Sequence, residues 1–188
     1  TKMNVFYRGL DNPVSISASG VQLSSLRPTI SHGSLRGANG DYIVRPGPRE
    51  TSSKISVYAQ LDDGTRKFMG DQSFRVLNLP PPFAVVDGVT KGEGQLTLAQ
   101  LTRLNEVRAE LKDFLFDVEF TVTGFMVSAT VSGGFAREMA SSSNRITSEM
   151  KQLFRGLNPG QTVTIKQVKA IGPDGVPQDL NPILIRVR

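Results

Sequence analysis

Three consecutive prolines, Pro80, Pro81 and Pro82, constrain this chain more than any other feature of its sequence. Each proline ring fixes φ near −65° and removes a backbone N–H, so the run cannot take part in a strand ladder. It favours the polyproline II conformation, which at about 3.1 Å per residue gives a stiff spacer of roughly 9 Å. Strand-like sequence ends before the run at Leu77 and starts again after it at Phe83. A proline-rich loop inside one domain is the alternative interpretation.

The position of this run predicts a joint at residues 80–82 between two domains, residues 1–79 and residues 83–188. Leu79 and Phe83 flank the prolines, and we expect each to anchor the joint on its own domain. With 188 residues in the chain, each half is large enough for one hydrophobic core of modest size.

Composition and charge exclude several classes of function. The chain has no cysteine, which excludes disulfides, thiolate catalysis and cysteine-ligated metals. Residues 1–79 hold ten Lys and Arg against six Asp and Glu, but these basic residues are scattered singly, so we expect no nucleic-acid partner. No apolar run approaches the ~18 residues that cross a bilayer, so we expect no membrane contact. A chain that opens Thr1-Lys2-Met3-Asn4 is expected to be a fragment or a mature form.

Short β-prone runs separated by turn residues fill residues 1–79. The clearest strand runs from Ile55 to Leu61, and Asp62-Asp63-Gly64-Thr65 after it predicts a hairpin. Further strands are predicted at residues 4–7, 14–18, 42–44, 66–69 and 74–77. Roughly seven short strands in a segment of this length predict an immunoglobulin-like β-sandwich.

Two short helices are predicted in residues 83–188. Thr97 and Gln100 fit a capping box and Leu96 and Leu101 fit a hydrophobic staple, which together predict a helix that ends near Asn105. The residues after it fit either a longer helix or an alternating strand. The second helix is predicted over residues 147–155, where one apolar stripe is made by Ile146, Met150, Leu153, Phe154 and Leu157.

The longest strand signal runs from Phe116 to Val131. Its apolar residues change parity after Gly124, and a one-residue slip exchanges the two faces of a strand. We therefore expect a bulge or bend near Thr123, or a strand that crosses from one sheet to another. Residues 162–170 and 183–187 are predicted to form a wide hairpin. The predicted fold is mainly β: an immunoglobulin-like β-sandwich followed by an α+β, mostly antiparallel domain with two short helices.

The sequence contains few residues in patterns that support catalysis. The single histidine, His32, lies in a polar segment without a nucleophile motif, and we expect it in a loop. The glycine-rich stretch 88–94 lacks the ending of a phosphate loop, and we expect it to be a mobile loop. We therefore predict no catalytic, cofactor-binding or metal-binding residue and no enzymatic activity.

Asp117 and Glu119 share one face of the predicted long strand, two residues apart. A cation site is one interpretation, but no further oxygen-ligand motif accompanies them. We favour a solvated or partner-facing polar stripe. The expected dimer or partner strand consists of Asp117, Glu119, Thr121 and Thr123.

Three segments carry a resemblance to a known family: residues 3–16 (MNVFYRGLDNPVSI), residues 82–88 (PFAVVDG) and residues 107–118, from VRAEL to FDV. Together they resemble the C-terminal half of the GldM/PorM family of gliding motility and type IX secretion in Bacteroidetes, and the chain looks closer to the PorM branch. The resemblance extends from near residue 3 to the C-terminus. It rests on structural segments without a catalytic signature.

The resemblance implies a non-enzymatic segment of a periplasmic shaft. In that family an N-terminal inner-membrane helix joins GldL/PorL in a motor driven by the proton gradient. The periplasmic domains form an extended homodimer that reaches the outer-membrane-associated ring of GldK/PorK and GldN/PorN. This chain lacks the membrane helix, so the expected role is to transmit motor motion to the ring. The competing class is a periplasmic or cell-surface β-sandwich module that binds glycans or peptides, although the lack of Trp offers it little support.

Overall fold

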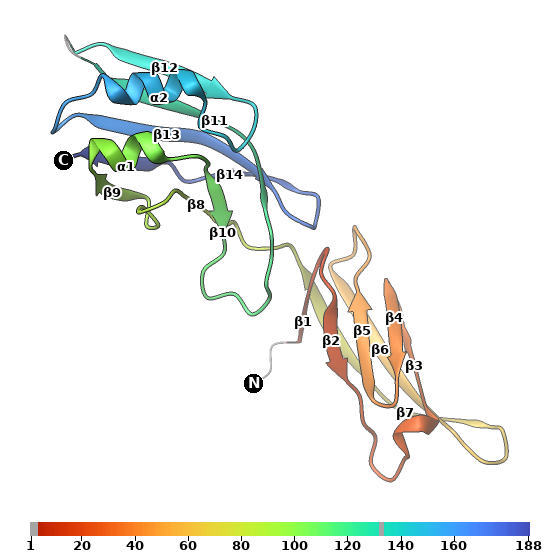
Figure 1. Ribbon diagram of the computed structural model, residues 1–188. Coiled ribbons are helices and arrows are strands. Elements are labelled where there is room, and N and C mark those ends of the chain that lie inside the picture. Colours follow the sequence, from red (N-terminus) through yellow and green to blue (C-terminus); the bar gives the residue numbers. More distant parts are fainter. Residues whose placement is uncertain (1–3, 132–133) are drawn as a thin grey trace. The chain divides into compact units, whose positions relative to one another are not determined.

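The computed structural model describes residues 4–131 and 134–188 (Figure 1). By its internal packing the chain divides into two compact units, Thr1–Leu79 and Pro80–Arg188. Each unit has its own hydrophobic core, and we describe each by itself.

The first unit is an immunoglobulin-like sandwich of two sheets, with strand orders β1-β7-β6-β3 and β2-β5-β4. β1 and β7 pair in parallel, and the other pairs are antiparallel. The strands are β1 (Val5–Tyr7), β2 (Asn12–Ser15), β3 (Leu26–Ile30), β4 (Ser34–Ala38), β5 (Asp41–Arg45), β6 (Ser52–Gln60) and β7 (Arg66–Leu77), with a short 3-10 helix (Leu23–Ser25) before β3. The core between the sheets is formed by Phe6, Ile16, Leu26, Tyr42, Val44, Ile55 and Val76.

The alternation of apolar and polar residues correctly predicts most strands of this unit. Where the observed strands differ from the predicted ones, the difference has a local cause. The two strands predicted at 66–69 and 74–77 are one strand, β7, with a register shift opposite Val57 and Tyr58 where Gly70 takes a φ of 136°. β3 and β4 were missed because Pro28 interrupts the first and Gly37 the second. The strand predicted at 14–18 ends at Ser15, since its partner β5 begins at Asp41.

Two edge strands of this sandwich carry a proline. β2 and β3 each lie at the end of a sheet, and they contain Pro13 and Pro28. Proline has no N–H to donate, so it is tolerated in an edge strand and makes that edge a poor template for another strand.

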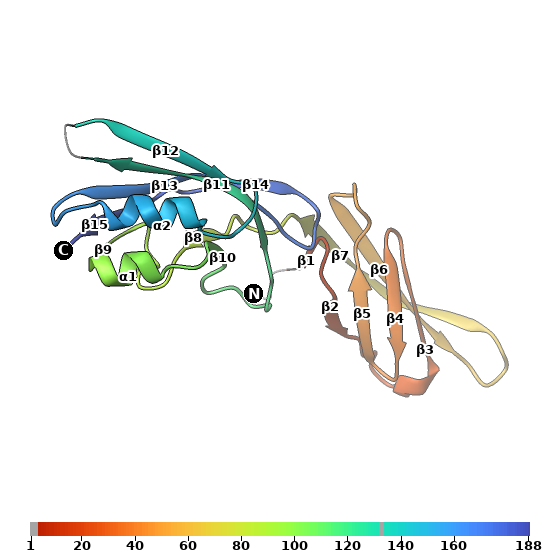
Figure 2. The ribbon, with the colours of Figure 1, turned by 45° about the horizontal axis from the view of Figure 1, so that its top comes forward.

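The second unit is built on a six-stranded, mostly antiparallel sheet with the order β12-β11-β13-β15-β9, in which β14 also pairs with β13. β9 and β15 pair in parallel, and β8 and β10 form a separate small sheet. The strands are β8 (Phe83–Val85), β9 (Glu93–Leu96), β10 (Arg108–Glu110), β11 (Thr121–Thr130), β12 (Ala136–Ser141), β13 (Thr162–Ile171), β14 (Pro177–Leu180) and β15 (Ile183–Val187). Both helices, α1 (Leu98–Arg103) and α2 (Ser148–Arg155), lie on one face of the large sheet (Figures 1 and 2).

The helices form for the reasons read from the sequence. Thr97 caps α1, and its side chain and that of Gln100 form the expected reciprocal capping box. The helix ends at Arg103, slightly before the predicted end, and the alternation beyond it belongs to β10. Thr147 caps α2, whose stripe of Met150, Leu153 and Phe154 is buried against the sheet.

The parity change at Gly124 is a β-bulge, as predicted. The pairing of β11 with β13 shifts register on both sides of Gly124, and on β13 Gln167 takes a positive φ of 51° at the same level. Thr121 pairs with Ile171 and Ala129 with Val163, so eight residues separate the two pairs on both strands. The two bulges therefore compensate each other and keep both arms of each strand facing one core.

The prediction that this strand begins at Phe116 is wrong. β11 starts at Thr121, which pairs with Ile171, the last residue of β13. After Ile171, the end of β13, the chain turns at Gly172 to Gly175. No strand therefore remains beside residues 116–120 to pair with them. The alternating pattern of residues 116–120 reflects burial, because Phe120 packs against the core. The pattern does not indicate strand pairing.

Candidate functional site

The residues of the predicted joint differ in burial. Leu79 is 4% exposed, whereas Phe83 is 47% exposed although it begins β8. The Phe83 ring lies 5.9 Å from Lys112 Nζ, within range of a cation–π interaction. The backbone after it is held by Asn181 Oδ1, which accepts from Ala84 N at 3.3 Å. Between them Pro80 is half-buried, Pro81 is exposed and Pro82 is buried.

The four residues of the predicted partner strand do not form one strand. Asp117 and Glu119 are exposed and precede β11, while Thr121 and Thr123 are exposed at its start. Thr123 Oγ1 donates to Lys169 O at 3.3 Å. From Phe125 to Thr130, β11 has β12 on one side, and it faces β13 on the other, so this part is not a sheet edge. The edge strand beside it is β12.

A cleft of about 380 Å³ lies beside this polar segment, lined by residues 106–110 and 118–122 with Asn144. Glu106, Glu110 and Glu119 line it, and Arg108 is the only basic residue among its lining residues. Arg108 donates to Asp87 Oδ1 at 2.8 Å and to Glu110 Oε1 at 3.1 Å. The hydrogen bond that Arg108 donates to Asp87 is the main reason that the pKa of Arg108 is raised. The cleft therefore has an excess of negative charge.

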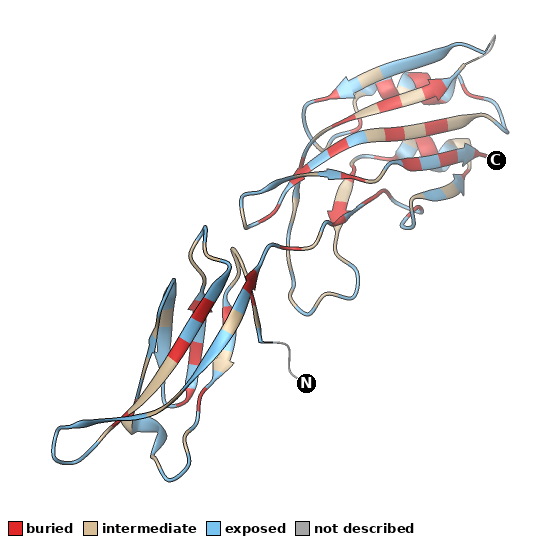
Figure 3. Ribbon diagram, turned by 180° about the vertical axis from the view of Figure 1, so that it is seen from behind, coloured by how far each residue is buried: buried red, intermediate tan, exposed pale blue. Residues whose placement is uncertain are grey.

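The face of the large sheet away from the helices is open (Figure 3). The residues of β11 and β13 that are not buried are mostly polar. Lys166 donates to Glu138 Oε1 at 2.6 Å across this face, and that hydrogen bond lowers the pKa of the carboxyl. The contribution of the pair to stability is present above the usual carboxyl range and is lost as the pH falls through it. Because both side chains are substantially exposed, the pair contributes little.

Among residues 4–131 and 134–188, no group of side chains is assembled into a recognisable catalytic site. His32 is exposed, and Ser31 Oγ lies 3.0 Å from its Nδ1. Within the same ranges no three His, Cys, Asp or Glu side chains gather as a metal site. No helix in the described part of the chain is long and apolar enough to cross a membrane. Gly88 lies in a tight turn, and Gly94 belongs to β9, so the glycine-rich stretch is not one continuous loop.

A partly exposed aromatic pair was not predicted from the sequence. Tyr58 and Phe68 face each other across β6 and β7, with ring centroids 5.5 Å apart, and Phe68 is 55% exposed. Their rings are inclined by 60°, so together they do not present a flat platform to a sugar ring. The sequence feature that could have predicted this pair is the hairpin at Asp62 to Thr65, which places Tyr58 and Phe68 opposite each other.

Comparisons with known families cover nearly the whole chain. Residues 1–77 match the family described as "GldM third domain", and residues 80–188 match the family described as "GldM C-terminal domain". No curated protein matches the sequence significantly.

Two similar solved structures show a distant likeness to this chain. The fibronectin(III)-like modules of Clostridium thermocellum CbhA are 13% identical with a TM-score of 0.31, over 99% of this chain and 90% of that chain. Chicken VE-cadherin EC1-2 is 14% identical with a TM-score of 0.26, over 98% of this chain and 96% of that chain. At these scores neither likeness carries an argument.

Proposed function

This chain belongs to the GldM family, and we propose on that premise that it is a non-enzymatic segment of a periplasmic shaft. In this proposal the shaft belongs to the type IX secretion and gliding machinery. It transmits the motion of an inner-membrane motor to the outer-membrane-associated ring. The observation that carries the proposal is the match of the whole chain, in order, to the third and C-terminal domains of that family.

The structure of each unit supports a mechanical role. The two units have separate cores, so a load applied to one need not disturb the packing of the other. The second unit begins with three prolines, which restrict the direction of the chain at the boundary, whereas a Gly/Ser linker would behave as a random coil.

The partners in this proposal are those of the family. The segment acts as a homodimer and meets the ring proteins GldK/PorK and GldN/PorN, and it is coupled to GldL/PorL through the part of the protein that carries the membrane helix. The acidic cleft beside Glu106 and Glu119 and the exposed edge of β12 are the surfaces of the second unit that we assign to partner contacts. The PorM branch remains a prediction.

The test replaces Pro80, Pro81 and Pro82 with Gly-Ser-Gly in the full-length protein. We expect both units to stay folded and their relative orientations to broaden in small-angle scattering. In cells, secretion or gliding is expected to fall more than protein abundance does. The matched control is Pro159→Gly, which removes an exposed proline in the loop before β13 and leaves the joint intact. Unchanged scattering together with unimpaired secretion would contradict the mechanical role of the joint.

A further inference from the structure

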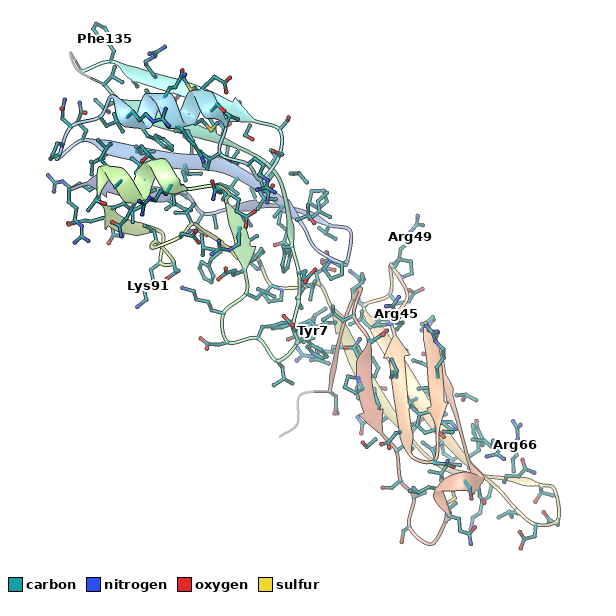
Figure 4. The ribbon with its side chains drawn as sticks, viewed as in Figure 1. Tyr7, Arg45, Arg49, Arg66, Lys91 and Phe135 are labelled. Carbon is teal, nitrogen blue, oxygen red and sulfur yellow. The ribbon has the colours of Figure 1, made fainter. Side chains whose placement is uncertain are left out.

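A groove lies on one side of the first sandwich, between the edge strands β3 and β4. It has a volume of about 330 Å³, at the small end of the range for ligand sites. Its apolar lining comes from Leu26, Leu35 and the ring of Tyr42. Its polar lining comes from Ser24, Arg27, Thr29, Asn39 and Arg66. Figure 4 shows Arg66 near the base of the β6–β7 hairpin.

The charge of this groove is unbalanced. It is lined by two arginines, and no Asp or Glu is among its lining residues. Two cations of the unit form ion pairs: Arg45 bonds to Asp11, and Lys54 lies 3.1 Å from Asp71. Arg27 and Arg66 line the same groove, and neither makes an ion pair with any residue in the described part of the chain.

Arg27 is held in place by the backbone. Its Nη1 donates to Ser24 O at 2.8 Å and to Leu26 O at 2.9 Å, which leaves Nε and Nη2 to donate elsewhere. A guanidinium that is already oriented loses less conformational freedom when it binds, and its planar fork matches the oxygens of a carboxylate or phosphate.

We propose that the β3–β4 groove binds an oxyanion, a carboxylate or a phosphate, that is attached to a short apolar body. Arg27 and Arg66 hold the two charged oxygens, and the Ser24 hydroxyl and the Asn39 amide supply further donors. The apolar body lies against Leu26 and Leu35. This site is independent of the mechanical role proposed above, because it uses the first unit alone.

The experiment titrates the chain with three probes that share one apolar body: hexanoate, hexyl phosphate and 1-hexanol. Binding is followed by amide chemical shifts in NMR spectra. We expect saturable shifts at residues 24–29 and 35–42 with at least one of the two anions and none with the alcohol. Binding is also expected to weaken as the salt concentration rises. Comparing hexanoate with hexyl phosphate then tells which oxyanion the groove prefers.

Two variants test the arginines. Arg27→Gln and Arg66→Gln each remove one charge-assisted contact, so each is expected to weaken anion binding about ten- to hundredfold. The matched control is Arg36→Gln, an exposed arginine of β4 outside the lining of this groove, which is expected to bind as the parent does. Both test positions are exposed, so folding is expected to be unchanged, and circular dichroism checks it. Binding of 1-hexanol equal to that of the anions, no saturable anion binding, or equal losses in all three variants would each overturn the proposal.

Discussion

At the scale of single residues, the first sandwich has no room for a methyl group at Gly37. A Cβ there would lie 2.2 Å from the carbonyl oxygen of Asp41, and φ is +137°, a value that other residues rarely adopt. Gly64 also has a positive φ, of +84°, but a Cβ there would meet nothing within 4 Å. Alanine substitutions at these two glycines therefore distinguish the free-energy cost of a strained backbone from that of a steric clash.

We predict that Gly37→Ala lowers the free energy of unfolding of the first unit by more than about 3 kcal/mol, since backbone strain and a backbone clash add. Gly64→Ala, with strain alone, is expected to cost about 1–2 kcal/mol. The measurement is urea unfolding followed by tyrosine fluorescence, because Tyr7, Tyr42 and Tyr58 are the three tyrosines of the chain and all lie in this unit. Equal losses in the two variants would mean that the sandwich adjusts around Gly37.

At the scale of elements, the start of α1 depends on one reciprocal pair. Gln100 N donates to Thr97 Oγ1 at 3.2 Å, and Thr97 N donates to Gln100 Oε1 at 2.9 Å. Thr97→Ala removes the first bond and is expected to lower the free energy of unfolding of the second unit by about 1 kcal/mol. Thr97→Ser keeps the hydroxyl oxygen that accepts this bond, so it is expected to retain most of the stability that Thr97→Ala loses. Urea unfolding followed by far-ultraviolet circular dichroism measures both, with Thr90→Ala in an exposed loop as control. Alanine and serine variants of equal stability would contradict the capping role.

The elements that could be predicted are those whose signals are local. The capping residues fixed α1 and α2, and the parity change located the bulge at Gly124. The opposing bulge at Gln167 could not be predicted, because neither the residue type nor its polar neighbours indicate a positive φ. Strand pairing is non-local, so the end of β13 at Ile171, which decides where β11 begins, left no trace in residues 116–120.

The same limit applies to the candidate sites. Asp117, Glu119, Thr121 and Thr123 were recognised as exposed polar residues, and they are exposed. The groove that holds Arg27 and Arg66 could not be predicted, since it lies between two strands whose proline and glycine residues hide them from an alternation pattern. Arg66 reaches this groove from β7, a strand distant from β3 and β4 in the sequence.

At the scale of the whole molecule, two separate cores predict two unfolding transitions. Tyrosine fluorescence reports the first unit alone, whereas far-ultraviolet circular dichroism reports both, because the chain has no tryptophan and no tyrosine after residue 79. We expect the fluorescence change to coincide with only one of two steps in the dichroism signal. A single step shared by both signals would show that the units unfold as one cooperative block.

The paired bulges at Gly124 and Gln167 also bear on how this domain can vary between lineages. Because the extra residue in β11 is balanced by one in β13, a deletion in either strand alone would shift part of that strand by one residue against the other and turn its apolar side chains outward. A compatible relative would have to gain or lose both residues together. These two positions lie 43 residues apart in the chain, yet we expect insertions and deletions at them to occur together.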